Sequence, residues 1–262
     1  MVGFNRCSSR LAGWLRVLIT AGIDLAAEPK GTALALIEWA GNKATLVELS
    51  VGTEDKNLIE KTSAAEKIGI DCALGWPVDF IEFLNRQTKL DSNTGGIEGD
   101  IAWRRRIAYR ETDRHVRQET GRWPLSVATD RLGMTALRAA GLLSKLAKHG
   151  VQIDRTGQGL VVEVYPGASL RVWQFQSSGY RASESKRSEL LQQLKARAPW
   201  LNFDSFATLM VESCDAFDSV IASLSARSAA LGHFEAPPPE FLEIARTEGW
   251  VALPNKQLEE LL

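Results

Sequence analysis

Five acidic residues occupy positions where buried strands and a helix face would otherwise be apolar. Asp24 ends the apolar run ITAGID, Asp71 ends the run IGID, and Glu163 lies inside LVVEVYP. Asp215 and Asp218 are three residues apart in DAFDSV, a spacing that places both on one face of a helix. Carboxylates that converge repel one another and lose stability on burial unless they are protonated or neutralised by a cation.

This composition predicts a site for Mg²⁺ or Mn²⁺, which prefer oxygen ligands. Two such ions about 4 Å apart can activate a water and stabilise the leaving oxygen during phosphodiester cleavage. We therefore predict a group of catalytic carboxylates, consisting of Asp24, Asp71, Glu163, Asp215 and Asp218. The predicted metal ligands are Asp24, Asp71, Asp215 and Asp218.

Each acid also has an ordinary interpretation. An aspartate at the end of a strand is often a turn or cap residue, and Asp215 and Asp218 near a helix start would complement the helix dipole. Glu163 would be equally well explained by pairing with an arginine in a partly buried site. The conjunction of all five favours the metal site over these separate explanations.

The strands that would position these acids are readable from apolar and alternating runs. Three apolar runs joined by short turns predict an antiparallel meander. A helical segment at 52–67 follows, and the fourth apolar run should therefore form a strand parallel to a central strand. Asp24 and Asp71 would then end adjacent parallel strands. The five predicted strands cover residues 17–25, 32–39, 43–50, 68–74 and 160–166.

Helices are expected to flank this sheet. Apolar residues recur at helical spacing in several segments, and Trp76-Pro77 is suited to a helix start. The sequence therefore predicts an α/β fold with a mixed five-stranded sheet, three antiparallel strands followed by two parallel ones, flanked by helices. The predicted helices cover residues 76–88, about 132–146, about 182–198 and about 213–231.

An arginine-rich helical insertion is predicted at about 89–131. Between Arg104 and Arg131 eight arginines stand against four acids, and arginine suits bidentate contact with phosphate. Arg114 is one of the arginines expected to contact a nucleic-acid substrate. The alternative is that these arginines pair with Asp113, Asp130 and the acids of the sheet, which would hold the site closed.

The remaining composition gives broad limits. The 262 residues carry a net charge of -1, so any polyanion must be held by a local patch or a metal. Three cysteines without C-x-x-C spacing and no apolar stretch of about 20 residues favour a cytoplasmic protein away from membranes. We predict a single domain over 17–262, preceded by an extension at 1–16. The oligomeric state stays open, with a homodimer among the possibilities.

Several stretches in order from about residue 18 resemble a family of predicted RNase H-like nucleases, long catalogued as a domain of unknown function in bacteria and archaea. These stretches are GIDLA, IGIDCALGWP, YRETDRHVR, VVEVYPGASL, DAFDSVIASLSAR and EGWVALP. The resemblance implies an RNase H-like fold with an acidic, metal-dependent site, and it implies the roles of Asp24 and Asp71 most strongly. It also implies that the R-x-T-D element, Arg110 and Asp113, belongs to the substrate pocket.

Three functions follow as hypotheses. The leading one is a metal-dependent phosphodiester hydrolase, a nuclease that acts on nucleic acid. The second is a nucleotide-binding ATPase or kinase-like protein, although Ala26 replaces the glycine expected in its D-x-G-x-T hairpin. The third is a protein that binds a partner or nucleic acid without cutting it.

Overall fold

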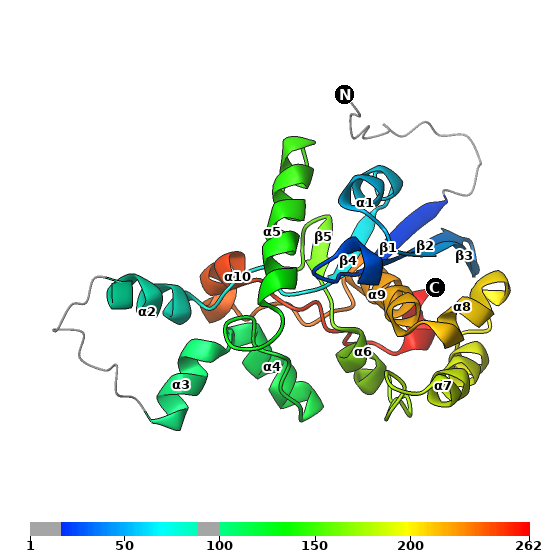
Figure 1. The fold of residues 1–262 in the computed structure, drawn as a ribbon. Helices are drawn as coiled ribbons and strands as arrows, with labels where there is room; N and C mark the ends of the chain where they lie inside the picture. The colour runs from blue at the N-terminus through cyan, green and yellow to red at the C-terminus, as the bar shows by residue number, and fades with distance from the viewer. Residues whose placement is uncertain (1–16, 89–99) are drawn as a thin grey trace.

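The computed structural model describes residues 17–88 and 100–262. The predicted extension at 1–16 and the first part of the predicted insertion, 89–99, lie outside the described residues. The described residues form an α/β fold in which helices pack on both faces of a mixed six-stranded sheet (Figure 1).

The sheet has the order β5-β4-β1-β2-β3-β6. Its strands are β1 (Leu18–Asp24), β2 (Ala33–Ala40), β3 (Lys43–Val51), β4 (Lys67–Asp71), β5 (Val161–Glu163) and β6 (Leu201–Asn202). The first three strands are antiparallel neighbours, and β4 and β5 are added parallel to β1, as predicted. The predicted number of five strands was wrong, because β6 pairs parallel with β3. Two residues are too few for any alternation pattern to be visible in the sequence.

Ten α-helices accompany the sheet in the described residues, and all the predicted helices are among them. The five helices that precede β5 in the chain are α1 (Asp55–Lys61), α2 (Val78–Thr88), α3 (Ile101–Ala108), α4 (Glu111–Thr120) and α5 (Gly133–Lys148). The others are α6 (Pro166–Val172), α7 (Glu184–Arg197), α8 (Ala207–Glu212), α9 (Cys214–Ala230) and α10 (Leu242–Glu248). Across residues 17–88 and 100–262, none of these helices combines the length and the apolar character needed to cross a bilayer.

The two faces of the sheet carry separate apolar cores. Ile23 of β1 and Ile70 of β4 contribute to the core under α1 and α5. Ile37 of β2 and Phe217 of α9 belong to the core on the opposite face, which α6, α7, α8 and α9 cover. Because side chains alternate along a strand, neighbouring residues of β1 and β4 point to different cores.

The helix α9 lies directly on the backbone of β1 and β4. A Cβ atom added to Gly22 would be 2.0 Å from the carbonyl oxygen of Ser219, and one added to Gly69 would be 2.6 Å from that of Ala222. No larger residue fits at either place. The Ser223 hydroxyl also donates to the carbonyl oxygen of Thr20 at 3.0 Å, which fixes the helix against β1.

The Gly22→Ala substitution should therefore destabilise the fold strongly. The added methyl group has no space unless α9 moves, and overpacking of this kind costs about 1–3 kcal/mol or more of unfolding free energy. The matched control is Gly141→Ala on the exposed side of α5, where a Cβ atom would have no neighbour within 4 Å. Alanine favours the helix over glycine, so this change should raise the unfolding free energy by as much as about 1 kcal/mol. Urea unfolding measures both, and equal stability of the two variants would contradict the close packing of α9.

Candidate functional site

Asp24 and Asp71 lie side by side at the ends of adjacent parallel strands. They are the last residues of β1 and β4, and the strand register pairs them directly. Each is two residues after a glycine that contacts α9, so alternation directs both carboxylates to the face that α9 covers. The predicted meeting of these two acids at one edge of the sheet is thus what the register produces.

The first turns of α9 bring two more acids to the same place. The helix begins after Ser213, whose hydroxyl accepts a hydrogen bond from the amide of Ala216. Asp215 lies in the first turn and is partly exposed, whereas Asp218 is only 3% exposed. The close seat of α9 on Gly22 and Gly69 places this end of the helix beside the strand ends.

Mutual repulsion marks these carboxylates as a cluster. Burial raises the pKa of Asp24 well above its ordinary value, and the charges of Asp71, Asp218 and Asp215 raise it further. Burial also raises the pKa of Asp71 to about 8, with the charge of Asp218 and, to a smaller extent, that of Glu163 adding to the effect. The charge of Arg181 opposes both shifts. At neutral pH the metal-free cluster therefore favours bound protons.

Asp218 is the one acid of the cluster with strong internal partners. It accepts a hydrogen bond from the Tyr180 hydroxyl at 2.7 Å and forms an ion pair with Arg181 at 3.2 Å. Burial raises the pKa of Asp218, and Arg181 and Tyr180 oppose that shift. Arg181 is half exposed, so it supplies a cation to the cluster from the solvent side.

The donor set of this cluster suits a hard divalent cation. All four side chains offer carboxylate oxygens, and repulsion among them would be relieved by positive charge. Among the residues that the structure describes, no group of three potential ligands is already arranged to hold a metal. Because Arg181 is paired with Asp218, a cation that binds Asp218 would compete with the positive charge of this guanidinium group.

Glu163 belongs to the other face of the sheet. The register of β5 pairs it with Ile70 rather than with Asp71, and Ile70 points to the core under α5. Its carboxylate accepts two hydrogen bonds from Arg110, at 2.7 and 2.8 Å, and one from the amide of Leu74 at 3.0 Å. The alternative interpretation of Glu163, as the partner of a buried arginine, is what this geometry supports.

Arg110 is a structural residue of the protein interior. It is 3% exposed, and its remaining guanidinium donors bind both carboxylate oxygens of Asp113 and the backbone oxygen of Glu248. No guanidinium N–H is left for a substrate. The prediction that Arg110 and Asp113 contact substrate finds no support in this arrangement. Arg114 is likewise engaged, with the carboxylate of Glu111 at 2.6 Å and the backbone oxygen of Arg106.

The two cysteines next to the cluster are neutral thiols. Burial raises the pKa of Cys214 to about 12, and it raises that of Cys72 further. The Cys214 sulfur lies 3.9 Å from an Asp218 oxygen. They therefore serve as small packing residues beside the acids rather than as nucleophiles.

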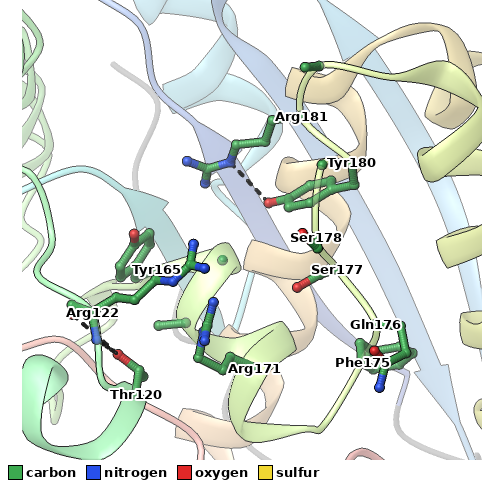
Figure 2. A pocket seen from close by; sticks show the side chains of 14 residues that line it. Thr120, Arg122, Tyr165, Arg171, Phe175, Gln176, Ser177, Ser178, Tyr180 and Arg181 are labelled. Carbon is green, nitrogen blue, oxygen red and sulfur yellow. Dashed lines mark hydrogen bonds between the residues drawn. The ribbon is translucent and has the colours of Figure 1, made fainter.

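A pocket of about 460 Å³ is lined in part by Arg181 (Figure 2). Arg181 also pairs with Asp218, so the pocket adjoins the acid cluster. Its positively charged lining consists of Arg122, Arg171 and Arg181. The insertion supplies only the first of these, so the arginine count of the insertion was a poor guide to the pocket. Arg171 and Arg181 follow the VVEVYPGASL stretch, ten residues apart, and they do not form a run of arginines like that of the insertion.

Comparison with known proteins gives one match. The model of a family described as "Protein of unknown function (DUF429)" matches residues 22–243, which include the last three residues of β1 and all of β4, β5 and α9. Searches of curated proteins and of solved structures found no match.

Asp71→Asn should stabilise the metal-free protein at pH 8 and leave it unchanged near pH 4. The folded-state pKa of Asp71, about 8, lies above the unfolded value of about 3.9, so the folded chain binds more protons between these values. Stability is then lost as pH rises through this range. A pKa shift of one unit corresponds to about 1.4 kcal/mol, so we expect Asp71→Asn to raise the unfolding free energy by at least ~1 kcal/mol at pH 8.

Urea unfolding in the presence of a chelator measures this gain across pH 4 to 8. Asp204→Asn is the matched control, because its carboxylate is 71% exposed and pairs only with Lys195 on the surface. A wild-type protein that is at least as stable as Asp71→Asn at pH 8 would show that the carboxylates do not repel.

Arg110→Leu should unfold the protein far more readily than Arg114→Leu. The first change leaves the buried carboxylates of Asp113 and Glu163 unpaired, at a cost of about 3–5 kcal/mol. The second removes a partly exposed ion pair with Glu111, worth about 1 kcal/mol or less. Thermal melting of both variants provides the measurement, and similar losses would argue against a structural role for Arg110.

Proposed function

The chain belongs to the DUF429 family of proteins of unknown function, and we propose that it is a metal-dependent phosphodiester hydrolase acting on nucleic acid. We further propose that its sheet is of the RNase H-like type, with three antiparallel strands followed by two parallel ones and the acids at the strand ends. The family description itself assigns no activity.

The observation that carries this proposal is the pairing of Asp24 with Asp71 opposite the start of α9. The two carboxylates meet on one face of the sheet, where Asp218 and Asp215 add to their repulsion. A fold gains no stability from such a cluster, so a bound ligand of positive charge is the simplest reason for it. When bound, Mg²⁺ or Mn²⁺ supplies positive charge to the reacting phosphate and activates the attacking water.

The residues of the chain would divide this work by position. Asp24 and Asp71, on the rigid strand ends, would hold the cation most directly, with Asp215 or Asp218 completing the site from α9. Arg181 would exchange its contact with Asp218 for a contact with the phosphate of the substrate. Glu163 would act only indirectly, by holding Arg110 on the far face of β5.

A non-catalytic binding protein is the second candidate, and one observation favours it. Arg181 already neutralises Asp218, and in the described part of the chain no three ligands are preassembled for a metal. In that case the cluster would be stable with protons bound and would need no cation. Binding of a divalent cation therefore separates the two candidates.

The test of the hydrolase is cleavage of single-stranded, duplex and hybrid nucleic acid in the presence of Mn²⁺ or Mg²⁺. Asp24→Asn and Asp71→Asn should lower the rate at least about 100-fold, because each removes a charge that holds the cation. Asp204→Asn, an exposed acid outside the cluster, should retain the wild-type rate.

A second readout is independent of the substrate chosen. Mn²⁺ should raise the melting temperature of the wild type at pH 7.5 and should not raise that of Asp24→Asn. If Mn²⁺ produces neither cleavage nor stabilisation of the wild type, the hydrolase proposal fails and the non-catalytic candidate is favoured.

A further inference from the structure

The pocket beside the acid cluster gathers positive charge from three separate segments. Arg122 follows the C-terminus of α4, Arg171 lies in the last turn of α6, and Arg181 lies in the loop before α7. Figure 2 shows Arg122 and Arg171 extending into the same space below Arg181. Three segments that are distant along the chain thus place guanidinium groups around one cavity.

These charges are poorly balanced by the protein. In residues 17–88 and 100–262, Arg181 has an ion pair with Asp218, and no ion pair is formed by Arg122 or Arg171. Like charges around a shared cavity repel one another, and an anion in the cavity would convert that repulsion into attraction. The planar guanidinium group matches the oxygen geometry of phosphate in particular.

The rest of the lining suits a nucleotide better than a bare anion. The aromatic side chains of Tyr165, Phe175 and Tyr180 form part of the wall, and the hydroxyl groups of Ser177 and Ser178 add hydrogen-bond donors. Phe175 and Tyr180 are buried, whereas Tyr165 is partly exposed and can pack against a base or a sugar. The volume of about 460 Å³ lies in the usual range of small-ligand pockets, about 300–1,000 Å³.

We propose that this pocket binds the phosphate group of a single nucleotide, and that it holds a nucleic-acid strand beside the acid cluster. The strand-holding role rests on the proposed hydrolase function, whereas phosphate binding does not require cleavage. Arg181 connects the two sites, because it lines the pocket and also contacts Asp218 of the cluster. If the bound nucleotide is part of a strand, the phosphodiester bond that joins it to the next nucleotide would lie close to the carboxylates.

The test is calorimetric titration with adenosine 5′-monophosphate in a chelating buffer without divalent cations. Wild-type protein should bind this nucleotide, and adenosine without phosphate should bind at least about tenfold more weakly. The double variant Arg122→Gln, Arg171→Gln should lose at least about tenfold in affinity, which corresponds to ~1.4 kcal/mol. Arg171→Lys, which keeps the charge, should lose less than Arg171→Gln.

Two controls address folding and general electrostatics. Arg122 and Arg171 are both exposed, so the variants should melt as the wild type does. Arg246→Gln removes an exposed arginine of α10 that pairs with Glu243 away from the pocket, and it should leave nucleotide affinity unchanged. Equal loss of affinity in Arg246→Gln would reduce the effect to net charge and overturn the pocket assignment.

The remaining measurements test nucleotide binding in the pocket separately from the proposed hydrolase activity. Asp24→Asn should still bind adenosine 5′-monophosphate, and a short single-stranded oligonucleotide should displace the nucleotide from it. Failure of the oligonucleotide to compete overturns the strand-holding role. Absence of nucleotide binding to the wild type overturns the pocket even if cleavage occurs. Arginine-dependent nucleotide binding without any metal-dependent cleavage would leave the pocket established and refute the hydrolase.

Discussion

The direct contact of α9 with the backbone of β1 and β4 is the constraint on which the acidic site depends. Gly22 and Gly69 leave no side chain between strand and helix, and the carbonyl oxygens of Ser219 and Ala222 occupy the space that a Cβ atom would need. Small residues on one side of the contact thus bring two peptide backbones together. This approach seats the first turns of α9 against the ends of the central strands.

The same contact brings four carboxylates together, and positive charge from the protein offsets their repulsion only in part. Asp24 and Asp71 meet Asp218 and Asp215 in a partly buried position, where burial and repulsion favour protonated carboxyls. Arg181 supplies one positive charge from the solvent side, where it pairs with Asp218 and donates a hydrogen bond to the Tyr180 hydroxyl. The arginine-lined pocket beside the cluster carries the opposite imbalance. A cation and a phosphate bound together would relieve both at once.

The face of the sheet opposite α9 is stabilised by a different set of charges. Arg110 bridges Asp113 and Glu163 with all three groups buried, and so it ties α4 to β5. Glu248 extends this connection by accepting hydrogen bonds from the amides of Val78 and Glu111. Buried charges that are fully hydrogen-bonded in this way specify structure, even though one guanidinium group faces two carboxylates. On the α9 face Asp218 has comparable partners in Tyr180 and Arg181, whereas the repulsion that Asp24 and Asp71 experience has no such structural explanation.

The sequence by itself determined five of the six strands, the four longest helices and the meeting of Asp24 with Asp71. These features depend on local periodicity and on the parallel return of a strand after a crossover helix, both of which are visible in the chain. The spacing of Asp215 and Asp218 likewise places them together on one helix, whatever the rest of the fold does.

Only the tertiary structure decided which charged residues face one another. Glu163 pairs with Ile70 instead of Asp71, and this shift of one residue in register directs it away from the cluster and toward Arg110. Arg171 lines the pocket from the short helix α6 and Arg181 from the loop before α7, and no periodicity in the sequence predicts that the two meet. Successive side chains of a strand point to opposite faces of the sheet, so a shift of one residue changes the partner of each side chain. Ion pairs also join segments that are distant along the chain. Local patterns therefore locate the acids but cannot assign their partners.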